Sequence, residues 1–170
     1  MLNPQRLRLW RKPRLLLGGV PPGAFNRVAI PLGLLGVVDL LSKRAMLSFL
    51  ALDQRVVVLP GVLDVTYVEN RHGAMGLFGD RPAALVGFAL LVVIVLSVLL
   101  SAQLRRSALA QVGFGLVLGG ALGNCLDRLV HGYVIDFIAL PHFYVFNLAD
   151  AGIAAGLFLV AIPAVQRARA

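Results

Sequence analysis

Two aspartates of this 170-residue chain lie in apolar runs that contain no adjacent cation. Asp136 stands in Val-Ile-Asp-Phe-Ile, and Asp150 stands in Phe-Asn-Leu-Ala-Asp-Ala-Gly. Burial raises the pKa of a carboxyl group, and two neighbouring carboxylates cannot both ionise easily, so one would keep a proton while the other activates water. Such a pair could hydrolyse a peptide bond. The same acids could instead line an ion or proton pathway, and the residues alone leave both hypotheses open.

Two further acids have cations close to them in the sequence. Asp39 and Lys43 are four residues apart, so on a helix they share a face and can pair. That pair could cap a helix at a membrane interface or take part in chemistry. Asp127 stands beside Arg128, which favours a structural salt bridge or a hydrogen-bond scaffold, with a catalytic role for Asp127 as the alternative.

Amide side chains accompany these acids. Asn124 and Asn147 could orient the carboxylates or bind a substrate backbone, because an amide both donates and accepts hydrogen bonds. They belong to four polar clusters, each at one end of a main segment of the chain: Asp39 to Lys43, Glu69 with Asn70 and the glycines after it, Gly123 to Arg128 with Asp136, and Asn147 to Asp150. If the segments are helices that bundle in order, we expect these clusters to converge into one site.

Other chemistries have little support in the sequence. The three histidines are scattered, without an H-E-x-x-H or paired-histidine spacing, so we predict neither a metal site nor a cofactor. The chain has no G-x-S-x-G elbow for a nucleophilic serine. Its single cysteine, Cys125, cannot form an internal disulfide and is expected to pack within a helix.

The composition indicates a membrane protein. Hydrophobic residues make up 59% of the chain and the mean hydropathy is +0.85, which exceeds what a soluble core of this size can bury. A transmembrane helix needs roughly 20 apolar residues, and residues 82–102 form such a run without any charge. Three further spans contain an occasional polar residue: about 28–50, 108–126 and 146–165. We therefore predict a mainly α membrane protein with four transmembrane helices.

The charges orient these four helices. The formal net charge is +8, and basic residues gather before the first span, between the second and third, and after the fourth. The positive-inside rule places these segments, and so both termini, in the cytoplasm. All eight acidic residues fall in the other two connections or at the span ends that face them. This topology explains the basic charge better than nucleic-acid binding does, since the chain offers no soluble basic face.

The regions outside the helices differ in character. Residues 1–27 are basic and proline-rich, which predicts a mostly irregular cytoplasmic arm, followed by a membrane domain over residues 28–166 and a short cytoplasmic tail at 167–170. Within residues 51–80, two β-rich runs flank Pro60-Gly61 and predict a small hairpin outside the membrane, on the bilayer surface. The aromatic stretch 130–145 is predicted to be a loop in the headgroup zone.

Four motifs in this order resemble those of the lipoprotein signal peptidases, or signal peptidase II, over about residues 37–156. Asp39-x-x-x-Lys43 is similar to the family's D-x-x-x-K, and residues 119–128 are similar to its GGxxGNxxDR block. Val134-Ile-Asp136-Phe resembles its VxDF motif, and Phe146-Asn-x-Ala-Asp150 resembles its FNxAD motif. In that family the aspartates of the last two motifs are catalytic, which implies that role for Asp136 and Asp150.

The resemblance also implies a substrate and a location. The chain would be an aspartic endopeptidase of the bacterial inner membrane that cleaves a diacylglyceryl-modified prolipoprotein just before the lipidated cysteine, near the outer face. Partners would be membrane lipid and this substrate, and globomycin would be an expected inhibitor. The resemblance also implies a small β-rich cradle on the extracytoplasmic face, in agreement with the predicted hairpin. Supporting or substrate-binding roles are implied for Asp39, Lys43, Asn70, Gly73, Asn124, Asp127, Arg128, Asn147 and Ala149.

One segment departs from the family pattern. The family usually has N-x-G-A-A-F-G where this chain has Asn70-Arg-His-Gly-Ala-Met-Gly76. With Asn70 and Gly76 kept in register, His72 replaces the usual glycine and Met75 the usual phenylalanine. Histidine is less favourable than glycine at a positive φ, so a different loop conformation and substrate preference are expected here. Outside the family, the rival hypotheses are a small transporter or ion channel and a structural assembly subunit.

Overall fold

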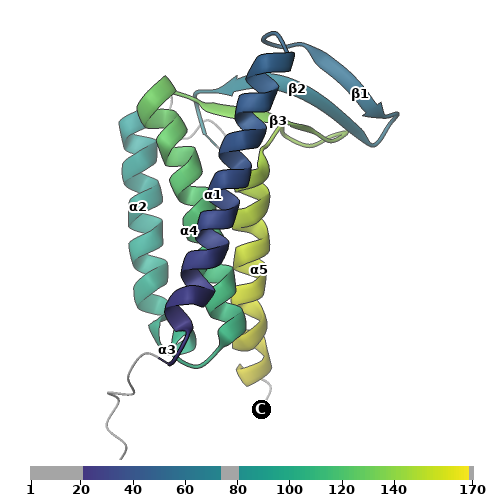
Figure 1. The fold of residues 1–170 in the computed structure, drawn as a ribbon. Coiled ribbons are helices and arrows are strands. Elements are labelled where there is room, and N and C mark those ends of the chain that lie inside the picture. The colour runs from purple at the N-terminus through teal and green to yellow at the C-terminus, as the bar shows by residue number, and fades with distance from the viewer. Residues whose placement is uncertain (1–20, 74–80, 169–170) are drawn as a thin grey trace, which may run out of the picture.

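The computed structural model describes residues 21–73 and 81–168, which form a helical bundle with a small sheet at one end (Figure 1). The long helices run roughly side by side, and α3 follows α2 at the far end. The elements, in chain order, are α1 (Ala24–Phe49), β1 (Arg55–Leu59), β2 (Leu63–Asn70), α2 (Pro82–Leu99), α3 (Ser101–Leu104), α4 (Ala108–His131), β3 (Val134–Ala139) and α5 (Leu148–Ala168).

Three helices of the described part are long and apolar enough to cross a membrane: α1, α4 and residues 148–166 of α5. The charge-free run predicted to span residues 82–102 is interrupted in the structure, because α2 ends at Leu99 and a separate short helix, α3, begins at Ser101. The apolar helix from Ala83 to Leu99 is therefore shorter than the other three. The fourth transmembrane span stays a prediction.

Helix α4 packs against α1 and α5 with its backbone very close to theirs. A Cβ atom added to Gly115 would lie 2.4 Å from the carbonyl oxygen of Val28 in α1, and one added to Gly120 would lie 2.4 Å from that of Ala149 in α5. Real side chains cannot occupy such positions, so glycine is required at both. Small residues bring membrane helices together in this way, so α4 lies between α1 and α5 at close range.

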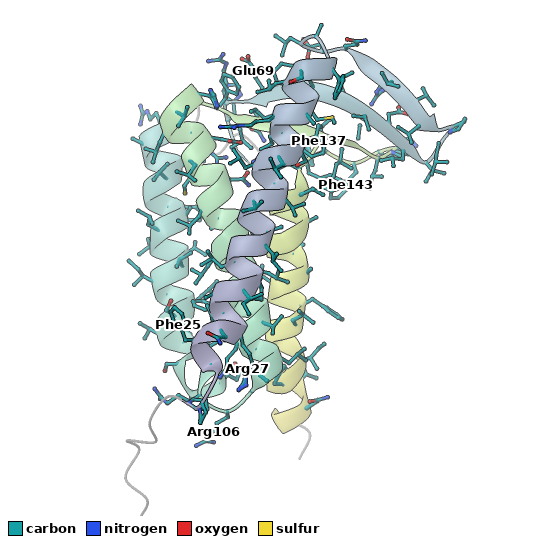
Figure 2. All side chains as sticks on the ribbon, viewed as in Figure 1. Phe25, Arg27, Glu69, Arg106, Phe137 and Phe143 are labelled. Atoms are coloured by element: carbon teal, nitrogen blue, oxygen red, sulfur yellow. The ribbon has the colours of Figure 1, made fainter. Side chains whose placement is uncertain are left out.

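Charged residues lie at both ends of the bundle, and acidic residues lie at the sheet end. Arg27 and Arg106 lie at the end remote from the sheet, as Figure 2 shows, whereas Glu69 lies at the sheet end. Residues 1–20, which make up most of the predicted basic arm, lie outside the described residues, as do 74–80 and 169–170.

The predicted hairpin is present. Strands β1 and β2 pair antiparallel, and Gly61 takes the left-handed φ of 72° in the connection between them. A third strand completes the sheet in the order β1-β2-β3. The prediction of a loop over residues 130–145 was wrong in this part, because β3 occupies Val134–Ala139 and pairs antiparallel with β2. Its side chains are buried on both faces, so the alternation that normally marks a strand is missing from its sequence.

Candidate active site

The centre of the polar cluster is the buried ammonium group of Lys43. Its Nζ lies 2.6 Å from Oδ2 of Asp39 and 2.8 Å from Oδ2 of Asp127, and it donates to Oδ1 of Asn124 at 3.0 Å. Lys43 and Asp39 are each only 1% exposed. The predicted pairing of Asp39 with Lys43 across one helical turn is thereby confirmed. A cation buried this deeply is stable only when its partners neutralise it and accept all of its hydrogen bonds, as they do here.

The ion-pair partner of Asp127 is a correction to the sequence expectation. Among the described residues, Asp127 pairs with Lys43 of α1 and forms no salt bridge with the adjacent Arg128. Its Oδ2 also accepts the backbone N–H of Ile135 at 3.2 Å, so it holds the start of β3 against α4. The expectation of a hydrogen-bond scaffold at Asp127 is confirmed, with Lys43 as its cation.

The carboxyl groups of Asp136 and Asp150 lie on the same amide network. Asn147 donates from Nδ2 to Oδ1 of Asp136 at 2.7 Å, and Asn70 donates to Oδ2 of Asp136 at 2.8 Å. Asn124 donates to Oδ1 of Asp150 at 2.7 Å. Neither aspartate belongs to a salt bridge within the described residues. Both acids therefore accept hydrogen bonds from side-chain amides and neither is in an ion pair, while their catalytic role stays a prediction.

Asp150 owes its position to the start of α5. The backbone N–H of Asn147 donates to Oδ2 of Asp150 at 3.3 Å, while the N–H of Asp150 donates to Oδ1 of Asn147 at 2.9 Å. This reciprocal pattern over three residues is that of a capping box, which satisfies N–H groups that the first helical turn leaves free. Asn147 and Asp150 of the F-N-x-A-D motif thus stabilise the start of α5, whatever chemistry they also perform.

The electrostatic environment differs for Asp136, which lies in β3 outside the helices. Burial raises the pKa of Asp136 to about 7, and the nearby charge of Asp150 acts in the same direction, whereas the hydrogen bonds from Asn70 and Asn147 and the charge of Lys43 oppose the shift. Asp150 stands in the first turn of a helix, where the helix dipole favours negative charge. The arrangement therefore suits a proton held on Asp136 near neutral pH.

The segment after β2 holds Asn70 in place. Oδ1 of Asn70 accepts the backbone N–H of Gly73 at 2.9 Å, which leaves Nδ2 to donate to Asp136. Gly73 takes the left-handed φ of 69°, whereas His72 is not among the residues with positive φ. The expectation that histidine would have to adopt a positive φ here was therefore wrong, because the next residue, Gly73, takes that conformation. Met75 and Gly76 lie outside the described residues.

Two of the remaining predicted residues also border the site. Ala149 is fully buried, and its backbone N–H donates to Oδ1 of Asp39 at 2.9 Å, which ties α5 to α1. Arg128 donates from Nη1 to the carbonyl oxygen of Asn124 at 3.2 Å, and its charge interacts with those of Asp136 and Asp150. Its buried Nε has no hydrogen-bond partner within the described residues, so Arg128 retains a donor for another group.

The cluster of Glu69 and Asn70 converges with the others through Asn70, as predicted, but Glu69 itself points elsewhere. Its carboxylate accepts hydrogen bonds from Tyr67 and Arg71, and Arg71 in turn lies over the ring of Tyr133.

Ile135, a residue that sequence reasoning missed, contributes its backbone to the site: its carbonyl oxygen accepts a hydrogen bond from Asn147 at 3.2 Å. Only the β-rich character of residues 134–138 could have indicated such a main-chain role.

A cavity lies apart from the two acids. It occupies about 320 Å³ between α1 and α4 and reaches Asp39 and Asp127, but neither Asp136 nor Asp150 lines it. Within residues 21–73 and 81–168, no three His, Cys, Asp or Glu side chains are grouped so that they could hold a metal ion. Asp136 and Asp150, which accept hydrogen bonds from side-chain amides, are therefore the strongest candidates for chemistry in the described part of the chain.

The fold and site define a helical membrane protein with two amide-bonded aspartates, the buried Asp136 and the half-buried Asp150, at the sheet end of its bundle. Its backbone is similar to a solved structure described as a bacterial membrane enzyme, with a TM-score of 0.75 at 23% identity over 83% of this chain and 88% of that one. The model of the family Signal peptidase (SPase) II matches residues 32–166. The chain belongs to the signal peptidase II family.

Relatives in this family are substantially similar in sequence. A lipoprotein signal peptidase of Syntrophomonas wolfei is 42% identical over 127 residues, which covers 74% of this chain and 84% of that protein. A lipoprotein signal peptidase of Trichormus variabilis is 37% identical over 134 residues, covering 76% of this chain and 84% of that protein. The resemblance inferred from four short motifs is thus confirmed over most of the chain.

Proposed function

We propose that the chain is an intramembrane aspartic endopeptidase that removes the signal peptide from diacylglyceryl-modified prolipoproteins, cleaving before the lipidated cysteine. The observation that supports this proposal most is the placement of Asp136, which is buried, and Asp150 on one network of side-chain amides, with no salt bridge from either acid to a cation of the described residues. Family membership supports a peptidase, and the names of the relatives support lipoprotein precursors as its substrates.

In this proposal the two aspartates divide acid and base work. Ionised Asp150 takes a proton from a water molecule as the water oxygen attacks the scissile carbonyl carbon, and Asp136 gives its proton to the carbonyl oxygen. The tetrahedral diol then collapses: the C–N bond breaks, the leaving nitrogen takes the proton from Asp150, and a hydroxyl proton returns to Asp136. Both carboxyl groups end in their starting states.

The surrounding residues have positioning and binding roles in this scheme. Asn147 fixes Asp136, and Lys43 fixes Asn124, which in turn fixes Asp150. Arg128 has an unused buried donor beside both acids, which suits a hydrogen bond to a substrate carbonyl. Asn70 and Gly73 would hold the substrate backbone near Asp136, and globomycin would compete for the same site.

We further infer that α2 is the fourth transmembrane helix and that the sheet end faces outward. The helix from Ala83 to Leu99 contains no charged residue and runs beside α4, and a length of 17 residues is at the lower limit for a span. Arg27 and Arg106 at the opposite end fit the positive-inside rule, which would place both termini in the cytoplasm. Labelling of single cysteines on either side of sealed vesicles tests this topology.

The test of the mechanism is the pair of variants Asp136→Asn and Asp150→Asn, with Asp64→Asn as the matched control on the sheet. Cleavage of a diacylglyceryl-modified precursor by purified protein should fall by about 10²–10⁴-fold in the first two and stay unchanged in the control. The amide nitrogen that D136N introduces would face a donor from Asn70 or Asn147, so the folded fraction of each variant is measured by thermal unfolding. Substantial turnover in both folded variants would refute the assignment, and flux of ions that depends on Asp136 would favour the transporter instead.

A further inference from the structure

The carboxylate of Glu69, at the sheet end of the bundle (Figure 2), is the centre of a second group of polar side chains. It accepts hydrogen bonds from the hydroxyl group of Tyr67 at 3.2 Å and from the guanidinium group of Arg71 at 2.5 Å. The hydroxyl group of Tyr67 also lies 3.3 Å from that of Tyr133. We call these four residues, Tyr67, Glu69, Arg71 and Tyr133, the glutamate cluster.

The glutamate cluster joins two segments of the chain. Tyr67 and Glu69 belong to β2 and Arg71 directly follows it, whereas Tyr133 directly precedes β3. The guanidinium group of Arg71 lies 5.0 Å from the centroid of the Tyr133 ring, a cation–π contact between the two segments. An exposed ion pair alone contributes little, but Tyr67 is only 8% exposed, so its hydroxyl group depends on the cluster for hydrogen bonds. Burial acts to raise the pKa of Glu69, and the hydrogen bonds from Arg71 and both tyrosines outweigh it, so this pKa lies below its ordinary value.

The glutamate cluster lies at and just beyond a β-bulge. The pairing of β2 with β3 shifts by one residue between Val65 and Val68. In the observed register Asn70 points to the face of Asp136 and donates to it at 2.8 Å, while Glu69 points to the other face. A slip of one residue turns each side chain to the opposite face of the sheet, so it would bring Glu69 towards Asp136 and remove the amide. The register of β2 therefore decides which of two neighbouring side chains reaches the site.

The two registers would give Asp136 different environments. A hydrogen bond from the amide of Asn70 favours the ionised form of Asp136, whereas the carboxylate of Glu69 in its place would disfavour that form. The other charged groups that act on Asp136 belong to helices and keep their places in either register: Lys43 of α1, Arg128 of α4 and Asp150 of α5.

We propose that Glu69 is a positioning residue: held by the glutamate cluster, it fixes the register of β2 after the bulge and thereby brings the amide of Asn70 to Asp136. Adjacent residues of a strand point to opposite faces, so anchoring the side chain of Glu69 on one face commits that of Asn70 to the other. Glu69 points away from Asp136 and acts through Asn70. The effect on cleavage rests on the proposed function, whereas the position of Asn70 does not.

The test measures the pKa of Asp136 in the variant Glu69→Leu, which removes both acceptor oxygens from the cluster. Protein labelled with ¹³C at its aspartate carboxyl groups is titrated by NMR in detergent micelles, with Asp136→Asn to assign the signal. Loss of the Asn70 donor should raise the pKa of Asp136 from about 7 by about 1 pH unit. Loss of the negative charge of Glu69 alone would lower this pKa, so the sign of the change identifies the lost donor.

Two further variants are the controls. Glu69→Gln keeps an acceptor oxygen for the cluster, so the pKa of Asp136 should not rise. Asp64→Leu removes the carboxylate of an ion pair on the same strand before the bulge, and it should also leave this pKa in place. If the chain is the proposed peptidase, the alkaline limb of the pH profile of kcat should move to higher pH in E69L only.

A double-mutant cycle separates positioning from general destabilisation. Asn70→Ala should raise the pKa of Asp136 as much as E69L does, and combining the two substitutions should raise it no further. An unchanged or lowered pKa in folded E69L, or a further rise in the double variant, would overturn the proposal. If E69L fails to fold, Tyr67→Phe combined with Tyr133→Phe removes both hydroxyl groups of the cluster and should also raise this pKa. The titration needs no turnover, so its result is independent of the peptidase assignment.

Discussion

The buried ammonium group of Lys43 allows a prediction with a defined magnitude. Lys43→Met preserves most of the side-chain volume but leaves Asp39 and Asp127 without their cation and Asn124 Oδ1 without one of its donors. Each carboxylate keeps only one backbone N–H, from Ala149 and Ile135 respectively. Breaking a buried ion pair by removing one partner costs about 3–5 kcal/mol, and here two anions lose the same partner.

Thermal unfolding in detergent measures this loss. For a chain of this size, a destabilisation of about 3–5 kcal/mol corresponds to a fall in Tm of roughly 6–20 °C. The matched control is Arg55→Met, which removes the cation of an exposed ion pair with Asp64. An exposed pair contributes about 0–1 kcal/mol, so R55M should leave Tm almost unchanged.

Neutralising the two anions distinguishes charge from packing. If lost electrostatic compensation is the cause, the triple variant D39N/K43M/D127N should recover a large part of the Tm that K43M loses, because no buried charge remains uncompensated. A K43M variant that unfolds within about 2 °C of the parent protein would refute the reasoning, since it would mean that water reaches the carboxylates. Failure of the triple variant to recover would point to packing instead.

Three further predictions concern the site. The pKa of Asp136 is raised from 3.8 to about 7, so between these pH values the folded chain holds a proton that the unfolded chain releases. The free energy of unfolding should therefore fall as pH rises from about 4 to 7, which a pH series of Tm would show. Cleavage should fall as pH rises through about 7, which a pH series of turnover would show. Gly73→Ala should destabilise the fold by about 1–2 kcal/mol and slow cleavage, because Gly73 has a φ of 69° and the added Cβ would lie 2.7 Å from the side chain of Leu85. The control Gly87→Ala should not destabilise the fold, because the space around its added Cβ is open. Asn147→Ala should cost about 2 kcal/mol in thermal unfolding and nearly abolish cleavage, because it removes an N-cap and the donor to Asp136; wild-type turnover would contradict this role.

Sequence reasoning succeeded where spacing within one element determines the geometry. Asp39 and Lys43 meet because they stand one helical turn apart, and the hairpin forms where β-rich runs flank Pro60-Gly61. Reasoning failed where the partner depends on how two helices are rotated against each other. Asp127 lies next to Arg128 in the sequence, but adjacent helical residues point about 100° apart, and packing of α4 against α1 presents Asp127 to Lys43.

The misplacement of Glu69 has a more specific cause. Simple alternation along β2 would put Glu69 on the same face as Leu63 and Val65, beside Asp136. The register instead shifts between Val65 and Val68, because β2 contains one residue more than β3 across this interval. One extra residue reverses the face of the sheet to which each later side chain of β2 points. Asn70 therefore lies beside Asp136, and Glu69 points to the opposite face. The bulge thus removes an acid from the site and supplies an amide donor.

The capping box of α5 explains how one motif can have both a structural and a chemical role. A helix N-terminus needs a side-chain acceptor and an acid or amide three residues later, and Asn147 and Asp150 satisfy that need with their own backbone N–H groups. Doing so fixes the rotamers of both residues before any substrate binds. The remaining donor of Asn147 then holds Asp136, and Asn124 holds the other oxygen of Asp150. In the proposed reaction both acids must stay aligned while a proton moves, so orientation by helix initiation would lower the reorganisation that the reaction requires.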